Sequence, residues 1–323
     1  MIEVNHLSKY FGETGAVNDI SFTVGRGEVL GFLGPNAAGK STTMRMITGF
    51  LTPTSGTAVI GGSDIIKDSL GARRKIGYLP ENAPAYPDMT VAGFLSFIAG
   101  IRGFSGEAKQ ARVRDTLDRC FLSDVRHQTI NTLSKGYKQR VCFAQSILHD
   151  PEYLIMDEPT DGLDPNQKHE VRAMIRDMSR DKAIVLSTHI LEEVEQVCTR
   201  VMIIARGRIV ADDTPEGLRE RSALHGAICL TVRKQDGKDL IEGIGDLPEI
   251  DRSEVVSESE SDMTLRLFPK ETASLRDSGV DRIVRRLFEK GFSVETFFME
   301  KGRLDEVFRM VTRSDSTTTD RVA

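Results

Sequence analysis

The amino-acid sequence predicts an α/β domain over residues 1–222 and a smaller α+β domain over residues 226–313. Three observations lead to this prediction. Short apolar runs alternate with helical patterns in the first part, as in a parallel sheet covered by helices. A glycine-containing loop joins the apolar run 29–33 to a helical pattern. Beyond residue 226 the predicted order becomes β-α-β-β-α-β, which is typical of a ferredoxin-like module.

The composition suits a chain that folds around a core. The 323 residues are 39 % hydrophobic and 28 % charged, which predicts one large domain or two ordinary ones. A net charge of −5 argues against nucleic acid as the main ligand, and none is expected. We see no apolar run of membrane-spanning length and no signal-like leader, so we expect any membrane role to depend on a partner. The four cysteines are widely spaced, which favours reduced thiols over a metal or disulfide site.

The chain begins with two predicted strands, 2–7 and 17–24, joined by a glycine-bearing turn from Gly12 to Gly15. Tyr10 and Phe11 stand just before this turn. An exposed aromatic ring at this place could stack on a nucleotide base, or it could simply pack the end of the strand.

The loop after the apolar run 29–33 has the pattern of a nucleotide-phosphate loop. Its backbone N–H groups would form a concave anion site, and the helix that starts near Lys40 would point its positive dipole end there. Lys40 would add a charge for the β- and γ-phosphates, and the Ser41 hydroxyl could ligate Mg²⁺. A chance turn before a helix is the alternative, which the full spacing disfavours. The predicted phosphate-binding residues are Gly34, Pro35, Asn36, Ala37, Ala38, Gly39, Lys40, Ser41 and Thr42.

The next segments predict a strand at Thr57–Ile60, after a turn at Thr52–Gly56, and a strand at Lys75–Leu79. Glu81 follows the second strand. A carboxylate just past a strand end in an α/β sheet lies at the edge where ligands bind. Glu81 is therefore a candidate for holding Mg²⁺ or the attacking water, with a solvated loop glutamate as the alternative.

Residues from about 88 to 150 predict a helical insertion in the α/β domain. An apolar helical stripe runs from Met89 to Ile101, and a charged segment follows from Glu107 to Arg119. A further helix opens within Leu133–Arg140. Its start carries Ser134 and Gly136, which offer a hydroxyl, backbone N–H groups and a helix dipole as a second anion site. On its own this pattern is no more than a helix cap.

Two acidic residues end the apolar strand predicted at Tyr153–Glu158. Asp157 would hold Mg²⁺ and Glu158 would reach the water that attacks the γ-phosphate. A tight turn and a helix from about 166 to 180 follow, and then a strand at Ala183–Ser187. His189 comes just after that strand, where it could hydrogen-bond a γ-phosphate, although a lone histidine is more often structural.

The C-terminal part contains no nucleotide motif. We expect either a regulatory or dimerising role for it, or simple packing against the first domain. The tail, 314–323, is short and polar and is predicted to be disordered. The predicted strands are 227–232, 254–256, 263–268 and 292–299, and the predicted helices are 238–244, 280–290 and 303–313.

An ordered set of motifs gives the first domain its family resemblance. The motifs are GPNAAGKST, YLPE, LSKGYKQR, YLIMDEPTDGLDP and STH. The set resembles the ATP-binding subunit of ATP-binding cassette (ABC) transporters and covers residues 1 to about 222. The form of the motifs and the C-terminal extension are most similar to bacterial exporter ATPases of the antibiotic-resistance and gliding-motility groups. LSKGYKQR, placed before the DEPTDGLD block, is the most specific of the five, because other phosphate-loop proteins lack it.

The resemblance implies roles for individual residues. Glu158 would be the general base and His189 the switch histidine, with Lys40 as a third catalytic group. ATP and Mg²⁺ are the implied cofactors. The implied metal residues are Ser41, Asp157 and Glu81, the implied adenine-stacking residue is Phe11, and the implied contacts to the nucleotide and surface of a second subunit are Ser134, Lys135, Gly136 and Asp164.

The sequence departs from the family pattern in three places. Ala37 stands where the family has glycine, and its methyl group would strain a backbone with positive φ by about 1–2 kcal/mol. Glu81 replaces a glutamine, which adds a negative charge near the metal. Lys135 and Tyr137 replace smaller residues in the LSKGYKQR segment.

The resemblance also implies a homodimer that buries two ATP molecules and opens on hydrolysis, and an integral-membrane permease on a separate chain. The subunit would then be cytoplasmic and peripheral on the inner face of the cell membrane. A soluble cassette ATPase of DNA repair or translation is the alternative, although such families usually carry coiled-coil or zinc insertions or two cassettes. A GTPase or small-molecule kinase would leave LSKGYKQR unexplained.

Overall fold

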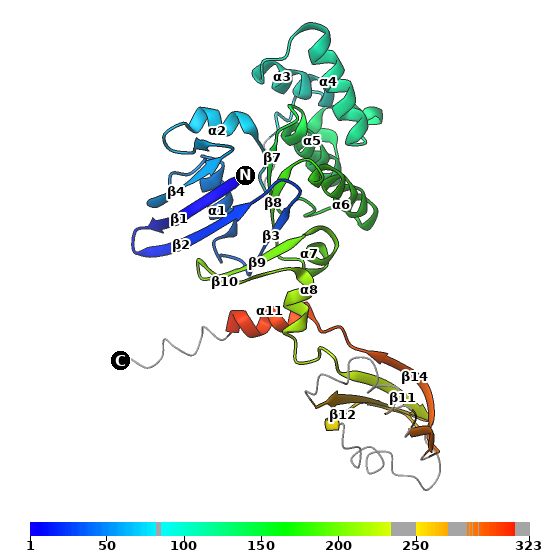
Figure 1. Ribbon diagram of the computed structural model, residues 1–323. Helices are drawn as coiled ribbons and strands as arrows, with labels where there is room; N and C mark the ends of the chain where they lie inside the picture. Colours follow the sequence, from blue (N-terminus) through cyan, green and yellow to red (C-terminus); the bar gives the residue numbers. More distant parts are fainter. Residues whose placement is uncertain are drawn as a thin grey trace. The chain divides into compact units, whose positions relative to one another are not determined.

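A computed structural model describes residues 1–81, 85–233, 250–270, 283, 285, 287–289 and 291–313. The chain forms two compact units, Met1–Pro215 and Glu216–Ala323 (Figure 1). This division lies a few residues before the domain boundary that we predicted at 222–226.

An antiparallel sheet opens the first unit, with strand order β2-β1-β4-β5. Its first two strands are longer than predicted, because only Gly12 and Glu13 form the turn between them. Gly12 has φ +58°, a left-handed conformation that glycine adopts without strain. The strands are β1 (Ile2–Phe11), β2 (Thr14–Val24), β4 (Ser55–Ile60) and β5 (Ser63–Asp64).

A six-stranded sheet forms the centre of the unit, with order β10-β9-β3-β8-β7-β6. All neighbouring pairs from β9 to β6 are parallel, and β10 is an antiparallel edge strand. Every residue of β3, β7 and β8 is buried, as expected where both faces of a parallel sheet are covered. The strands are β3 (Val29–Leu33), β6 (Ile76–Leu79), β7 (Tyr153–Asp157), β8 (Ala183–Thr188), β9 (Arg200–Ala205) and β10 (Arg208–Asp213).

The main core lies between the two sheets. Helix α1 (Lys40–Ile47) contributes Met44, Met46 and Ile47 to a buried cluster that also contains residues of both sheets. The prediction of a strand from Lys75 was wrong at its first residue, because Lys75 ends helix α2 (Ser69–Lys75). That helix begins where the Asp68 side chain accepts a hydrogen bond from the Gly71 N–H at 3.1 Å, a local capping signal.

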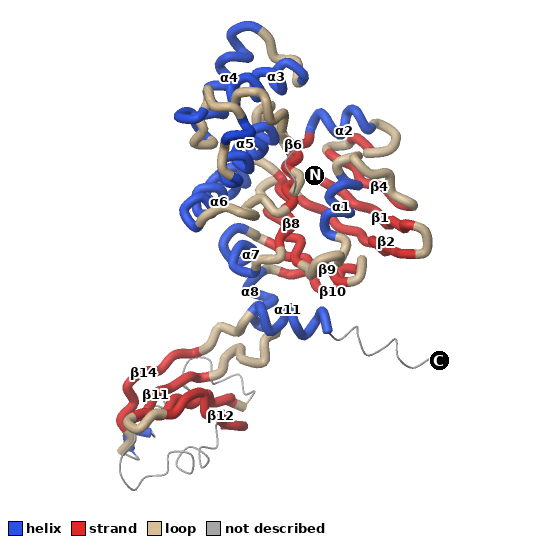
Figure 2. Tube along the Cα trace, turned by 180° about the vertical axis from the view of Figure 1, so that it is seen from behind, coloured by secondary structure: helices blue, strands red, loops and turns tan. Residues whose placement is uncertain are grey.

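Three helices separate β6 from β7, within the span 88–150. They lie together at one end of the unit, and α4 is a second helix in the segment that we predicted only as charged (Figures 1 and 2). Helices α6 and α7 lie beside each other after β7 and β8. The helices are α3 (Val91–Ile101), α4 (Gly106–Arg119), α5 (Lys135–Ile147), α6 (Pro165–Ser179) and α7 (Leu191–Val197).

The second unit contains one antiparallel sheet, with order β12-β13-β11-β14. In this order β13 separates β11 from β12, which is the split arrangement of the predicted ferredoxin-like module. The predicted helix 238–244, part of the predicted helix 280–290 and the tail 314–323 lie outside the described residues. The elements are α8 (Pro215–Glu220), β11 (Ile228–Arg233), β12 (Ile250–Glu258), β13 (Asp262–Pro269), β14 (Ser293–Met299) and α11 (Leu304–Arg313).

All four cysteines are unpaired and buried, as the absence of a disulfide pattern predicts. Of the helices in the described ranges, none has the length and apolar character needed to cross a membrane.

Candidate functional site

The phosphate loop leaves the buried strand β3 and enters helix α1. Gly34 and Gly39 are fixed by space, since a Cβ atom would lie 2.4 Å from the Ile204 oxygen at Gly34 and 2.5 Å from the Ala16 oxygen at Gly39. Ala37 has φ +62°, so the alanine does occupy a left-handed backbone. This conformation costs about 1–2 kcal/mol for a residue with a Cβ atom.

Lys40 is buried at the first turn of α1, with 6 % of its surface exposed. Its Nζ donates hydrogen bonds to the backbone oxygens of Gly34, at 2.7 Å, and Pro35, at 3.2 Å. Burial lowers the pKa of Lys40, and the carboxylates of Glu158, Asp157 and Glu81 oppose that effect. The ammonium group is therefore held against the loop, beside the acidic residues that follow β7 and β6.

Asp157 ends β7 beside the start of α1. Its Oδ1 accepts hydrogen bonds from the hydroxyl of Ser41, at 3.1 Å, and from the hydroxyl of Ser187. Its Oδ2 is buried, and no residue in the described part of the chain donates to it. A buried carboxylate oxygen without a donor requires a partner, and carboxylate and hydroxyl oxygens are the ligands that Mg²⁺ prefers. Asp157 and Ser41 therefore fit a magnesium ion.

Glu158 follows directly and has φ +50°. Its backbone N–H donates to the Ser187 backbone oxygen and hydroxyl, both at 3.2 Å, which fixes this unusual backbone. The carboxylate Oε1 lies 3.0 Å from His189 Nδ1. Burial raises the pKa of Glu158, while the hydrogen bond from His189 and the charge of Lys40 lower it. Burial therefore makes this carboxylate a stronger proton acceptor than an exposed glutamate.

Two other predicted residues, Glu81 and Phe11, are exposed. Glu81 stands just beyond β6, and its charge opposes the lowering of the Lys40 pKa, so it lies near the lysine of the loop. Phe11, at the end of β1, is 53 % exposed, and Lys9 Nζ lies 5.3 Å from its ring centroid. The ring of Phe11 is accessible for stacking.

The second predicted anion site lies at the start of α5. Ser134 is exposed and caps the helix by accepting a hydrogen bond from the Tyr137 N–H at 3.4 Å. Gly136 is buried, and a Cβ atom there would lie 2.2 Å from the Gln167 side chain. Lys135 Nζ lies 2.7 Å from Asp161 Oδ2. Within the described ranges, no hydrogen bond or ion pair connects Ser134 or Lys135 with the phosphate loop.

Asp164 starts α6 in a similar way, because its side chain accepts a hydrogen bond from the Gln167 N–H at 2.9 Å. The Gln167 side chain lies against Gly136, so the start of α6 packs against the start of α5. Apart from Phe11 at the end of β1, the predicted site residues fall into two groups, one around α1 and the other around the starts of α5 and α6.

Ser187 is a site residue that the sequence analysis missed. Its hydroxyl binds Asp157 and receives the Glu158 N–H. The sequence did contain a signal for Ser187. It is a hydroxyl residue near the end of a fully buried strand, two residues before the predicted histidine, and a buried hydroxyl needs a hydrogen-bond partner.

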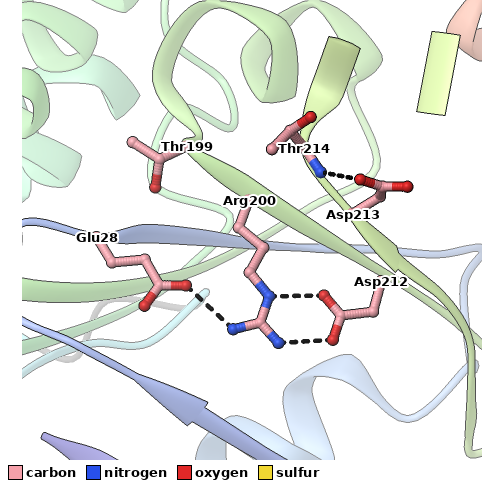
Figure 3. Close-up of a pocket in the computed structure, with 6 residues that line it drawn as sticks. All are labelled: Glu28, Thr199, Arg200, Asp212, Asp213 and Thr214. Carbon is pink, nitrogen blue, oxygen red and sulfur yellow. Dashed lines mark hydrogen bonds and ion pairs between the residues drawn. The ribbon is translucent and has the colours of Figure 1, made fainter. Parts of the chain in front are cut away.

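A separate pocket lies beside β9 and β10 (Figure 3). Arg200 fills it with a two-pronged ion pair to Asp212, with both distances 2.6 Å, and a further contact to Glu28 at 3.2 Å. These contacts raise the pKa of Arg200. The Arg200 guanidinium is therefore already paired with two carboxylates of the pocket lining.

Comparison with known proteins agrees with this geometry. The family model described as "ABC transporter" matches residues 17–161. An uncharacterized ABC transporter ATP-binding protein of Bacillus subtilis, YxlF, is 33 % identical over 292 residues, covering 86 % of this chain and 97 % of that protein. The chain belongs to the ABC transporter family of ATP-binding proteins.

Other family members match a smaller share of this chain, and for some of them the match is part of a longer protein. The probable multidrug ABC transporter ATP-binding protein YbhF of Escherichia coli is 37 % identical over 224 residues, which cover 69 % of this chain and 39 % of that protein. A solved structure entitled "Structure of ATP binding subunit of ABC transporter" has 32 % identity and a TM-score of 0.64, covering 68 % of this chain and 92 % of that one. The predicted ABC-type α/β fold is therefore confirmed.

Proposed function

We propose that this chain is the ATP-hydrolysing subunit of an exporter whose membrane-spanning part is a separate chain. The names of its ABC relatives support export. Besides the multidrug protein, they include the linearmycin resistance ATP-binding protein LnrL of Bacillus subtilis, 36 % identical over 234 residues that cover 72 % of this chain and 75 % of LnrL. A Nod factor export ATP-binding protein of Burkholderia lata is 36 % identical over 220 residues, which cover 68 % of this chain and 72 % of that protein.

The single observation that carries the proposal is the cluster at the ends of β3, β7 and β8. Five groups meet there, each with a distinct role in nucleotide hydrolysis. Lys40 neutralises charge on the β- and γ-phosphates. Glu158 accepts the proton of the attacking water, and His189 orients the Glu158 carboxylate through its bond at 3.0 Å. A magnesium ion held by Ser41 and Asp157 would neutralise charge that develops between the β- and γ-phosphates.

The other predicted residues complete the nucleotide site in the same proposal. Phe11 stacks on the adenine ring, and the backbone N–H groups of the loop residues 34–42, apart from Pro35, which has none, bind the phosphates. Glu81 lies near the metal or the attacking water. Its negative charge would add to that of Asp157 in attracting a magnesium ion, and we keep both roles in the proposal.

A second subunit explains the residues at the starts of α5 and α6. Ser134 and Lys135 are exposed at this helix start, and among the described residues neither has a hydrogen bond or ion pair to the chain's own phosphate loop; Gly136 follows them, buried against Gln167. In a two-fold dimer, each helix start would face the nucleotide on the other subunit, with Asp164 at the interface. ATP would close the pair through its γ-phosphate, and hydrolysis would open it.

This arrangement places the chain on the cytoplasmic face of a membrane, bound to an integral-membrane permease. For residues 226–313 we retain both possibilities, a regulatory or dimerising role and packing against the ATPase domain. The permease proposal is tested by affinity purification from membranes of the native cell. Recovery of a polytopic membrane protein supports export, whereas recovery of ribosomes or DNA contradicts it.

The catalytic proposal is tested with purified protein, MgATP and the variant Glu158→Gln. Loss of the general base is expected to lower ATP turnover by about 10²–10⁴-fold. Nucleotide binding remains, so the variant accumulates as an ATP-bound dimer that size-exclusion chromatography resolves from the monomer. Rapid turnover by the variant would remove Glu158 from this role.

A further inference from the structure

A buried carboxylate outside the nucleotide cluster joins two of its supporting segments. Glu193, on α7, is 3 % exposed. Its Oε1 accepts a hydrogen bond from the Thr160 hydroxyl, and its Oε2 accepts one from the Thr188 hydroxyl at 2.7 Å. Both threonines are buried, with 2 % and 0 % of their surface exposed. One carboxylate thus binds two side chains from different parts of the chain, sheltered from solvent.

The two threonines flank the proposed catalytic pair. Thr160 lies two residues after Glu158, and Thr188 lies immediately before His189. The Thr188 hydroxyl also accepts a hydrogen bond from the Ile190 N–H at 3.0 Å, which closes the turn around the histidine. The contact between the Glu158 carboxylate and the His189 ring therefore bridges the same two segments that Glu193 holds.

The charge of Glu193 is compensated from α6, which packs beside α7 (Figure 2). Arg172 Nη2 lies 3.8 Å from Glu193 Oε1, and the Arg172 side chain is only 7 % exposed. Its Nη1 also contacts Glu192, at 3.0 Å, and Gln196, at 2.8 Å. A buried carboxylate is tolerated when it is both paired and hydrogen-bonded, and Glu193 meets both conditions.

We propose that Glu193 is a positioning residue for ATP hydrolysis, which fixes the turn after Glu158 and the turn at His189 at one separation. The inference rests on the proposed function. The side chain of His189 is 51 % exposed, so surrounding side chains confine its ring little and its place depends on its backbone. A displacement of about 1 Å at a catalytic group can lower the rate about 10²-fold.

The test compares two neighbouring glutamates of α7 in the full-length protein. Glu193→Gln keeps the size of the side chain but removes its charge and one accepting oxygen. We expect kcat for MgATP to fall at least tenfold, with KM changed less than threefold, because the nucleotide still contacts the phosphate loop. Glu192→Gln is the control: this glutamate also contacts Arg172, yet it is 64 % exposed, and in the described part of the chain the two threonine hydroxyls donate to Glu193 instead. Its kcat is expected to stay within twofold of the wild type.

Two shape-conserving variants separate positioning from stability. Thr160→Val and Thr188→Val each delete one hydrogen bond to Glu193, and each is expected to lower kcat severalfold while KM is retained. When Glu158→Gln is already present, adding either threonine variant should not lower kcat further, because there is no general base left to position. An equal loss in both backgrounds would indicate a merely structural role and overturn the proposal.

The outcomes distinguish this inference from the proposed function. A wild type that hydrolyses ATP, together with a Glu193→Gln variant of unchanged kcat, overturns the role of Glu193 alone. If Glu193→Gln does not fold, unchanged kcat in both threonine variants overturns that role as well. A pure wild type without ATP turnover, alone and with its membrane partner, contradicts the proposed function and the inference with it.

Discussion

The starts of helices α1 and α5 use the same physical device in different settings. Each presents free backbone N–H groups and a helix dipole, which together attract an anion. At α1 the cap residue is Gly39, no side chain occupies the N–H groups, and Lys40 is buried against the loop. At α5 the Ser134 side chain caps the helix, and Lys135 is 69 % exposed and paired with Asp161. The first site is organised within one chain, whereas the second faces solvent.

This difference is consistent with the proposed dimer, in which the second site would gain its role from a partner. The attraction between an anion and an isolated, exposed helix start contributes about 0.3–1 kcal/mol, and salt weakens it. The α1 site combines the dipole with a buried lysine and the acidic residues that suit a metal ion. We therefore expect α1 to determine nucleotide affinity and α5 to determine turnover in the closed dimer.

Removing the lysine of the first site gives the largest expected effect. Lys40→Ala deletes the buried ammonium group and its bonds to Gly34 and Pro35. We expect kcat/KM for MgATP to fall by about 10³-fold, or about 4 kcal/mol of transition-state stabilisation. Ser134→Ala should leave nucleotide affinity nearly unchanged and lower kcat about tenfold. Equal losses of affinity in the two variants would contradict the division of roles.

Mixing these two impaired variants sharpens the comparison. In a mixed dimer, one site combines an intact phosphate loop from the Ser134→Ala chain with an intact α5 from the Lys40→Ala chain. The other site lacks both groups. We expect the mixture to hydrolyse ATP at up to about a quarter of the wild-type rate, since random pairing makes half of the dimers mixed and each has one working site.

Activity that is merely the average of the two separate variants would argue against shared sites. The controls are the Lys40→Ala and Ser134→Ala variants measured separately, each at the same total protein concentration as the mixture. Turnover in the mixture should also rise more steeply with protein concentration than nucleotide binding does, because only turnover requires the dimer.

The sequence predicted the separate parts of the proposed α1 site because each part has a local signal. The loop spacing with Lys40 is one short segment and the acidic pair that includes Asp157 is another, and the buried run before each predicts a parallel strand. Non-local contacts were not predictable in this way. Ser187 and Glu193 act through residues about 30 positions away, and no spacing rule marks such pairs.

The errors in the predicted secondary-structure elements also came partly from contacts between residues that are distant in the sequence. The prediction that Lys75 starts a strand failed because the helix cap at Asp68 and a bond from Lys75 Nζ to the Gly61 oxygen, at 2.6 Å, extend α2 to this residue. Strands β9 and β10 were not predicted: β9 pairs with β3, which lies about 170 positions earlier, and β10 joins the sheet only through β9. The hypotheses of a dimer and of a role in export came from the family resemblance, because the chemistry of neighbouring residues does not indicate either one.

The alanine in the phosphate loop provides a smaller test of the α1 site. Ala37→Gly removes a Cβ atom from a backbone with φ +62°. Relief of about 1–2 kcal/mol of strain is partly offset by the greater entropy of glycine in the unfolded chain, so we expect a net gain in unfolding free energy of about 0.5–1 kcal/mol. Thermal unfolding with and without MgATP checks this. As a control, Ala38→Gly, at a residue outside the left-handed region, is expected to destabilise the chain instead.

The ion pair at the α5 site gives the smallest expected effect. Lys135 and Asp161 are 69 % and 50 % exposed, so water and salt screen their attraction despite the distance of 2.7 Å. A double-mutant cycle with Lys135→Met and Asp161→Asn should give a coupling energy below about 1 kcal/mol in unfolding experiments, falling further at 1 M salt. The same cycle measured on kcat should show stronger coupling, because closure of the dimer excludes water from this face. A coupling that is equally weak in both measurements would mean that α5 stays exposed during turnover, and the contrast between the two helix starts would then reflect local structure alone.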